Sequence, residues 1–436
     1  MTALPEAFTE RMSRQLGEEL PDFLRALAGR PVRGIRMNPE KPFEGMEAYT
    51  GGERIPWTET GYVLPEESTA GATVFHEAGA FYLQEPAAML PAEVMDARPG
   101  EILLDLCAAP GGKSTQMGLK LKGEGLLVCN EPIRKRAQIL SRNIERMGIT
   151  NSIVTSCFPD KIPESWNGMF DGVLVDAPCS GEGMFRRDPE TRKEWTAEQA
   201  AGCAKRQREI LREAARLVRP GGRLVYSTCT YNPEENEEIV GWFTREFPEF
   251  RTEPFRVPGA DGEKGYYLCL PHRDIGEGQF TALMRRTGTG ERPRMNRPFP
   301  LPDREELRLF REQFPWLPEP DGRFGNLLVR MGECPDLRGV PVLRAGLHLA
   351  EARGKILIPD HAAALGGRIV NDAPVTELGR EDAARYLSGL SVEGDAGGWT
   401  VLRYRGLPLG WGKGSGGQIK NHYPKGLRKE RILTEP

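Results

Sequence analysis

The stretch LLDLCAAPGGKSTQ, residues 103–116, joins the end of a buried strand to a glycine turn and the start of a helix. Its first residues end an apolar run, EILLDL (101–106), that is typical of a short buried strand. Pro110, Gly111 and Gly112 make the turn, and KSTQMGLKL begins the helix. An open α/β sheet builds a ligand crevice from such units at the carboxyl ends of its strands, and the first N–H groups of the helix can bind an anion. The stretch alone predicts a nucleotide-like ligand, although a tight turn without any ligand would also fit.

The composition is that of an ordinary globular protein. The chain has 436 residues, enough for two or three domains, with 39% hydrophobic and 28% charged residues. The net charge is −3, so any nucleic-acid binding must depend on local basic patches. We find no signal-peptide pattern and no apolar run of membrane-spanning length. The eight cysteines are scattered singly, without a zinc-like cluster, so we expect a cytoplasmic protein with free thiols and no metal.

Strands and helices alternate through the central part of the chain. Helices are expected at 133–148 and at 197–218, where Thr196 and Gln199 suit a capping box and RPGG ends the helix. Apolar runs predict strands at 101–106, 125–131, 152–157, 170–181 and 223–229. This alternation predicts an α/β fold with a mostly parallel, doubly wound sheet. The runs 266–270 and 280–286 are expected to close it as an antiparallel pair.

The regions on either side of this sheet differ from it in composition. Residues 1–30 have helical spacing, and the segment after residue 286 is rich in Gly, Pro and Arg. The last part of the chain has short strand-like runs and turn glycines, which indicate a small β-rich module. We expect four parts, with boundaries at 1–80, 81–286 (the central domain), 287–304 (a linker) and 305–436.

Glu131 narrows the class of ligand. It ends the second predicted strand, 26 residues after Asp105, and a carboxylate there can accept two hydrogen bonds from a ribose diol. A solvated glutamate would explain this residue equally well in isolation. The glycine turn has Cys107 where a phosphate loop has its first glycine, and it lacks G-x-G-x-x-G. Glu131 and the turn together favour a nucleoside ligand rather than a dinucleotide.

Two cysteines follow strand ends. Cys179 lies in Asp-Ala-Pro-Cys after the fourth strand, and Cys229 lies in Ser-Thr-Cys-Thr after the fifth. Both are expected at the sheet edge that carries the glycine turn. A buried cysteine is usually only a small apolar residue. Two cysteines beside one crevice favour a nucleophile, whose thiolate electropositive neighbours would stabilise.

Several motifs resemble one family. DLCAAPGGKSTQ (105–116), DAPCSGEGMFRRDP (176–189) and STCTYNPEENE (227–237), in this order, are similar to motifs of the RNA cytosine-5 methyltransferases of the Nop/Sun family. YLQEPAAML (82–90) resembles the segment before their catalytic domain. The tail LRYRGLPLGWGKGSGGQIKNHYPKGLR (402–428) resembles the C-terminal RNA-binding module of the branch that acts on the bacterial small ribosomal subunit. The resemblance implies a Rossmann-like class I methyltransferase sheet between an N-terminal α+β RNA-binding region and a C-terminal PUA-like module.

The resemblance also implies a cofactor, S-adenosylmethionine. Glu131 would hold its ribose, Asp176 would lie beside both the cofactor and the target base, and Arg136 would add a contact. The cofactor would also contact the whole turn: Cys107, Ala108, Ala109, Pro110, Gly111, Gly112 and Lys113. In this family an acid often follows the third strand, near the adenine. Here Phe158 stands close to that position and Asp160 two residues later, so a contact from Asp160, stacking by Phe158 and an ordinary loop all stay open.

The same resemblance assigns chemistry to the cysteines. Cys229 matches the nucleophile, and Cys179 matches the cysteine that releases the product. C5 of cytosine is a poor nucleophile, and a thiolate added at C6 makes it enamine-like and able to attack a methyl group. Asp176 would act as a base or stabilise the adduct through N3. The target base must leave its stack, which costs less in single-stranded RNA.

Basic residues outside the crevice fit an RNA partner. The helix at 134–146 carries Arg134, Lys135, Arg136, Arg142 and Arg146. A solvated charged face would explain that helix as well. The tail interleaves glycines with Lys413, Lys420, His422, Tyr423, Lys425, Arg428 and Lys429. Such a patch would bind the RNA backbone in a salt-dependent manner.

The sequence therefore predicts a monomeric, S-adenosylmethionine-dependent RNA cytosine C5-methyltransferase acting on 16S rRNA of the small ribosomal subunit, with no DNA or membrane partner. A tRNA-directed member of the family is the nearest alternative, because only the tail favours rRNA. The intact Cys179 and Cys229 argue against a non-catalytic ribosome-assembly factor with this fold. An amine methyltransferase would use an Asn- or Asp-Pro-Pro-Tyr-like loop, which 176–179 does not match. The sequence names no target cytosine, nor whether naked RNA or an assembled subunit is the substrate.

Overall fold

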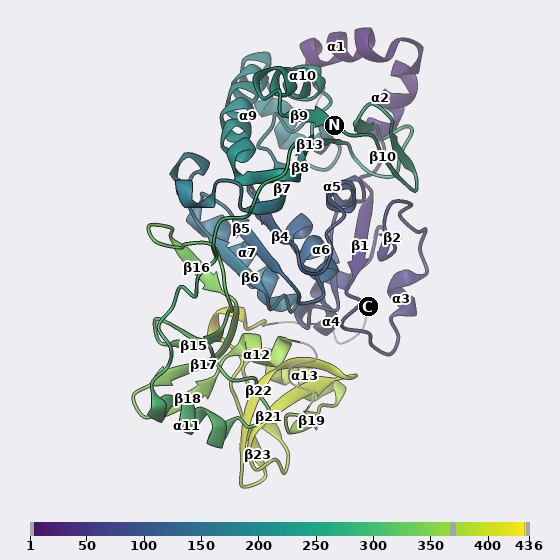
Figure 1. Cartoon of the computed structure of the whole chain (residues 1–436). Helices are drawn as coiled ribbons and strands as arrows, with labels where there is room; N and C mark the ends of the chain where they lie inside the picture. Colours follow the sequence, from purple (N-terminus) through teal and green to yellow (C-terminus); the bar gives the residue numbers. More distant parts are fainter. Residues whose placement is uncertain (1–3, 367–371, 431, 433–436) are drawn as a thin grey trace.

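The computed structural model describes residues 4–366, 372–430 and 432. A mixed β-sheet with helices on both faces forms the centre of the molecule (Figure 1). The N-terminal helices and a small N-terminal sheet lie along its flank, and the β-rich C-terminal region, drawn in green to yellow, lies below it in this view. Within these described residues no helix is long and apolar enough to cross a membrane.

The central sheet has nine strands in the described part of the chain. Eight follow the order β12-β13-β8-β7-β4-β5-β6-β16, and β9 pairs with β13. The parallel strands are β4 (Ile102–Asp105), β5 (Leu126–Asn130), β6 (Ser152–Thr155), β7 (Phe170–Asp176) and β8 (Val218–Thr228). The antiparallel strands are β9 (Phe250–Thr252), β12 (Tyr266–Cys269), β13 (Gln279–Arg286) and β16 (Val342–Ala345). The doubly wound sheet and its closing pair are thus confirmed, and the strand order reverses beside β4, where such sheets bind ligands.

Both faces of this sheet are buried. Leu104, Val128 and Val173 belong to one apolar cluster, while Leu103 and other alternate residues belong to a second cluster on the opposite face. Burial on both faces explains why these strands are continuous apolar runs in the sequence. The covering helices are α5 (Leu90–Met95), α6 (Gly112–Lys120), α7 (Arg134–Arg146), α9 (Ala197–Leu217) and α10 (Glu237–Glu246). A short helix, α8 (Pro189–Glu194), and a hairpin of β10 (Phe255–Val257) and β11 (Ala260–Gly262) lie in the connections.

Three details differ from the prediction. The helix expected at 1–30 is two helices, α1 (Glu6–Leu16) and α2 (Leu20–Ala28), because Gly17 takes a positive φ of 54° between them. The helix α9 does end just before RPGG (219–222). The strand β8, however, begins directly after the helix and includes RPGG, and a register shift against β7 accommodates these extra strand residues. The strand β16, which pairs with β6, comes from the C-terminal half of the chain and was not predicted.

The N-terminal region braces the glycine turn. It contains β1 (Arg33–Met37), β2 (Gly61–Leu64) and β3 (Phe81–Leu83) in the order β2-β1-β3, with the short helices α3 (Glu47–Thr50) and α4 (Val74–Glu77). Arg36 on β1 is buried and donates to the side chains of Gln84 (3.1 Å) and Thr115 (2.7 Å) and to the carbonyl of Gly112 (3.1 Å). This region therefore supports the start of α6 directly.

The described part of the C-terminal region contains two further sheets. One has the order β14-β15-β17-β18: β14 (Gly322–Phe324), β15 (Leu327–Arg330), β17 (Leu347–Arg353) and β18 (Ile356–Pro359). The other has the order β19-β21-β22-β23-β20: β19 (Val375–Glu377), β20 (Val392–Glu393), β21 (Gly398–Tyr404), β22 (Leu407–Ser415) and β23 (Gln418–Asn421). Among the described residues of this region, three α-helices accompany the sheets: α11 (Arg304–Gln313), α12 (His361–Leu365) and α13 (Arg380–Leu387). The predicted β-rich module is therefore confirmed.

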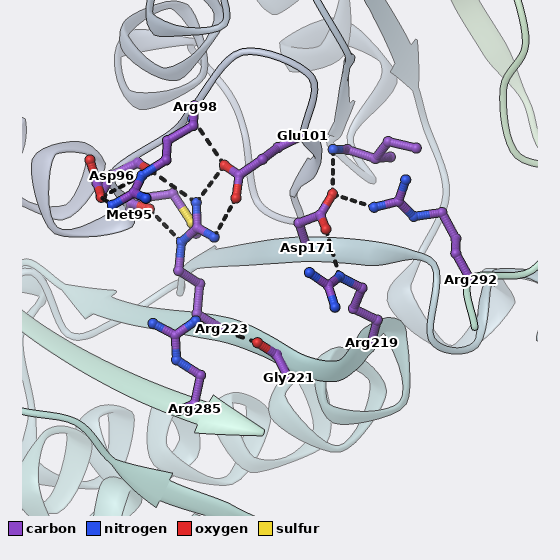
Figure 2. Close-up of polar contacts among 11 residues, drawn as sticks. Met95, Asp96, Arg98, Glu101, Asp171, Arg219, Gly221, Arg223, Arg285 and Arg292 are labelled. Carbon is purple, nitrogen blue, oxygen red and sulfur yellow. Dashed lines mark hydrogen bonds and ion pairs between the residues drawn. The ribbon is translucent and has the colours of Figure 1, made fainter. Parts of the chain in front are cut away.

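A cluster of ion pairs lies at the edge of the central sheet where the parallel strands begin (Figure 2). The Asp171 carboxylate accepts from the N–H of Ile102 (2.7 Å) and from Arg219 (2.6 Å) and Arg292 (2.5 Å), and Arg223 binds Glu101 with two bonds of 2.7 Å. A groove of about 1300 Å³ opens here, but these acids are neutralised by cations and the groove lies opposite the predicted crevice. The predicted site lies at the other edge of the sheet.

Candidate active site

The glycine turn between β4 and α6 is a tightly packed cradle. Gly111 has a φ of 112°, and a Cβ there would lie 3.1 Å from the Leu140 side chain, so glycine is needed for both conformation and space. Arg136 donates to the carbonyl of Ala109 (3.0 Å), and Asn143 donates to that of Pro110 (2.9 Å). With Arg36 on the carbonyl of Gly112, side chains from two directions hold the turn.

Two buried acids flank this turn. Asp105, at the end of β4, is 1% exposed, and its Oδ2 accepts from Ser114 (2.6 Å). Its Oδ1 has no partner of hydrogen-bonding geometry among the described residues, and burial raises its pKa to about 7. Glu131 is 2% exposed, accepts from the N–H of Ile133 (3.0 Å) and lies 3.3 Å from Arg136.

These acids fit S-adenosylmethionine. An unpartnered buried carboxylate oxygen is costly, and the ammonium group of a methionine moiety would complete the bonds of Asp105. The Glu131 carboxylate retains acceptor capacity for ribose hydroxyls. Asp105 was not among the predicted cofactor residues, although an acid at the strand end directly before the turn is a sequence signal that could have identified it.

Asp176 and Lys113 form an ion pair. Asp176 ends β7, and its Oδ2 lies 2.8 Å from the Lys113 ammonium, while Gln279 on β13 reaches its Oδ1 at 3.4 Å. Burial opposes the charge on Lys113, but the Asp176 carboxylate outweighs it and raises the pKa of the ammonium. The structure thus brings two predicted residues from different elements together as a charged pair. Gln279 was missed because its strand is remote in sequence and antiparallel.

The two predicted cysteines meet at the same edge. Their Sγ atoms are 3.3 Å apart, and the N–H of Cys229 also donates to the Cys179 sulfur at 3.3 Å. The hydrogen bond with Cys229, together with burial, raises the pKa of Cys179 well above its usual value. A Cys179 thiol and a neighbouring Cys229 sulfur can exchange a proton, which suits nucleophilic and acid–base chemistry.

The remaining predicted residues occupy different environments. Burial raises the pKa of Cys107 well above its usual value, which argues for a packing role for its side chain. Asp160 lies on the surface in an ion pair with Lys161 (2.9 Å), and Phe158 is 58% exposed. In the described structure the Asp160 side chain makes no hydrogen bond to the cradle.

Comparison with known proteins agrees with this geometry. The chain matches the family models for the 16S rRNA methyltransferase RsmB/F over residues 92–285, the N-terminal domain of 16S rRNA methyltransferase RsmF over 4–86, and the methyltransferase RsmF PUA domain over 373–429. Ribosomal RNA small subunit methyltransferase F of Escherichia coli O81 (strain ED1a) is 32% identical over 98% of this chain and 97% of the relative. The protein of the same name from Aliivibrio fischeri (strain MJ11) is 31% identical over 99% and 98%.

Solved structures share the fold. A methyltransferase homolog protein from Pyrococcus horikoshii has a TM-score of 0.55 at 25% identity, covering 65% of this chain and 95% of its own. NSun6 from the same organism, solved with SFG, has a TM-score of 0.58 at 22% identity, covering 65% and 99%. Fold, site and family match define an S-adenosylmethionine-dependent RNA methyltransferase. The near-complete matches narrow this class further: the chain belongs to the ribosomal RNA small subunit methyltransferase F family.

Proposed function

We propose that this protein methylates C5 of cytosine in 16S rRNA through a covalent bond between Cys229 and C6 of the base. The observation that carries the proposal is the 3.3 Å separation of the Cys179 and Cys229 sulfurs beside the Lys113–Asp176 ion pair. Such a reaction requires a nucleophilic cysteine with a second cysteine beside it, a fixed cation and a carboxylate, all at one edge of the sheet. S-adenosylmethionine supplies an electrophilic methyl group when it is bound.

Cys229 would begin the reaction by adding to C6. Lys113 interacts electrostatically with Cys229, so its ammonium group can offset negative charge that develops beside the reacting sulfur. Addition makes C5 nucleophilic, and C5 takes the methyl group. The C5 proton must then leave before the Cys229–C6 bond can break and restore the ring. Asp176, which also stabilises the adduct at N3, takes the C5 proton, and Cys179 then releases the product by donating its thiol proton to the departing Cys229 sulfur.

The C-terminal module offers a surface for the RNA. Lys413 on β22 lies 5.3 Å from the Trp399 ring centroid, and the Trp399 and His422 rings lie 4.4 Å apart. Lys413 is also paired across the strands with Lys420. An aromatic platform between cations suits a base stacked beside its phosphates. We propose this Trp399 surface, defined by Trp399, Lys413, Lys420 and His422, as an RNA contact.

Other residues of the predicted basic segments have structural roles. Tyr423 is buried, and Lys429 forms an ion pair with Glu77 (3.2 Å). On α7, Arg146 donates to the carbonyls of His76 and Phe81. We therefore propose as RNA contacts only the exposed basic residues of α7 and of the C-terminal tail.

A methyl-transfer assay with labelled S-adenosylmethionine tests the reaction. The substrates are 16S rRNA, assembled small subunits and tRNA, and bisulfite sequencing locates the modified cytosines. We expect methylation of the small-subunit RNA; methylation of tRNA alone would instead favour the tRNA-directed function. We also expect the enzyme to act as a monomer in the cytoplasm, and light scattering of the purified protein tests the monomer.

Cysteine variants test the covalent step. Cys229→Ala should abolish methyl transfer while retaining cofactor binding. Cys179→Ala should accumulate a protein–RNA adduct, visible as a slow band on a denaturing gel. Cys203→Ala on α9 is the matched control and should behave like the parent protein. Adduct from Cys229→Ala would reverse the two assignments, and full activity of Cys229→Ala would refute covalent catalysis by this residue.

A further inference from the structure

Glu235 is a buried acid that the proposed chemistry does not use. It lies in a turn six residues after Cys229, and the side chain is fully buried. Its Oε2 accepts from the N–H of Ser180 (2.9 Å) and from the Gln207 amide (2.9 Å), and its Oε1 accepts from the Ser180 hydroxyl (2.5 Å). All three partners act as donors, which matches an ionised carboxylate that only accepts.

These bonds join the two cysteine loops. Ser180 follows Cys179, and Gln207 on α9 donates its amide also to the carbonyl of Pro178 (3.1 Å), so both neighbours of Cys179 are held. The Ser180 hydroxyl lies 2.8 Å from that of Thr230, the residue after Cys229. The Glu235 carboxylate therefore helps to join two loops fifty residues apart in sequence, beside the direct Ser180–Thr230 contact and a bond from the Gly183 N–H to the Cys229 carbonyl (2.8 Å).

The charges around the cysteine pair are asymmetric. Lys113 lies on the side of Cys229, whereas Glu235 acts on Cys179, adding to the hydrogen bond and burial that raise the pKa of Cys179. Burial raises the pKa of Glu235 itself, and its bonds to Ser180 and Gln207 oppose this. Glu182, the other carboxylate that acts on Glu235, is neutralised by Arg11 at 2.7 Å.

We propose that Glu235 is a positioning residue for the methyl-transfer reaction: it holds the two cysteine loops together and places its negative charge beside Cys179. This inference rests on the proposed function, because it assumes different roles for the two cysteines. A purely structural acid would support the fold without distinguishing one thiol from the other.

Alkylation by iodoacetamide, followed by mass spectrometry across a pH series, reads the two thiols without any RNA. In the parent protein the raised pKa of Cys179 should keep its labelling slow below pH 9, and the rate at Cys229 serves as the reference for the difference between the two thiols. Glu235→Gln keeps the side-chain shape and removes the charge, so labelling of Cys179 should begin at lower pH and the difference should shrink. Glu234→Gln, at the exposed neighbouring residue, is the matched control and should leave both rates unchanged.

Kinetics provide the second readout. Glu235→Gln should lower kcat for methyl transfer by at least about tenfold, because loss of alignment at a reacting pair is costly, with KM for S-adenosylmethionine within about twofold of the parent value. Glu235→Asp keeps the charge with a shorter reach, so it should restore the thiol difference more than it restores kcat.

The outcomes separate this inference from the proposed function. Parent-like kcat and labelling in Glu235→Gln would overturn the positioning role. If Glu235→Gln does not fold, Ser180→Ala provides the test, since it removes the hydroxyl contacts to Glu235 and Thr230 and keeps the charge of Glu235. The kcat should then fall while the thiol difference persists, and an unchanged kcat would overturn the role. A labelling shift in Glu235→Gln combined with an active Cys229→Ala would refute the covalent mechanism and retain the electrostatic asymmetry.

Discussion

Asp105→Asn should weaken cofactor binding and remove most of its pH dependence. The Asp105 carboxylate is 1% exposed, and this burial raises its pKa from 3.8 to about 7 despite the hydrogen bond from Ser114. Asp176 raises this pKa further, while Ser114 and Lys113 oppose the rise. A bound ammonium group would pair with the ionised form, and cofactor affinity should therefore follow its ionisation.

The magnitude follows from the pKa. A shift of about three units, at 1.36 kcal/mol each, corresponds to roughly 4 kcal/mol against ionising Asp105 in the unliganded protein. Below pH 3.8 the group is protonated in both folded and unfolded chains, so it costs nothing. As the pH rises to 7 only the unfolded chain releases its proton, and the folded protein loses stability progressively. Asparagine removes this cost, so the variant should be more stable than the parent above pH 7, by at most about 4 kcal/mol.

Isothermal titration with S-adenosylhomocysteine at pH 6 and pH 8 measures the binding. With a pKa near 7, the ionised fraction rises from roughly a tenth to roughly nine-tenths, so the parent protein should bind about tenfold more tightly at pH 8. Asp105→Asn should show equal affinity at both pH values and, at pH 8, a loss of about 1.5–3 kcal/mol for a missing hydrogen bond to a charged group. Asp96→Asn, at an exposed acid, is the control. Equal parent affinities at the two pH values would refute the reasoning, as would a variant that keeps the parent's slope.

Further predictions concern the edges of the molecule. Asp171→Ala leaves the N–H of Ile102 and two arginines without their acceptor. The free energy of unfolding, measured by urea denaturation, should therefore fall by about 2–4 kcal/mol, and a loss under about 0.5 kcal/mol would contradict a stabilising role of the ion-pair cluster. In filter binding, Lys413→Ala should reduce the salt slope of RNA affinity by about one, whereas Trp399→Ala should cost about 1–3 kcal/mol at an unchanged slope. Unaltered RNA affinity in both variants would exclude the Trp399 surface. Gly111→Ala should weaken cofactor binding at least about tenfold, since its φ of 112° and the 3.1 Å approach to Leu140 oppose a side chain; parent-like binding would show that the turn adapts.

The structure also changes how the C-terminal module should be tested. Deleting the tail would remove Trp411 and Tyr423, which are buried in the module and its contacts. Such a deletion would unfold the module, so a loss of RNA binding would have no specific meaning. Point variants on the Trp399 surface avoid this problem because Lys413 is exposed.

The sequence by itself determined the central sheet and the contents of its crevice. Strands buried on both faces must be apolar throughout, so β4, β5 and β7 can be recognised in the sequence as short apolar runs between turn residues. A positive φ and a close approach require glycine at Gly111, which made the turn visible locally. Parallel strands end at one edge, so the order of the chain alone placed Cys179 and Cys229 beside that turn.

Only the tertiary structure decided what surrounds these residues. Nothing local distinguishes β16 from an ordinary strand of the C-terminal region, and its place beside β6 depends on a partner almost two hundred residues away. Arg292, in the segment expected to be a linker, is held by Asp171 on the sheet. In the sequence Glu235 resembles a solvated acid in a polar loop. In the structure it is buried, because Ser180 and Gln207 from distant elements donate hydrogen bonds to its carboxylate. Burial of a charge depends on partners that are remote in the chain, and local sequence patterns do not reveal those partners.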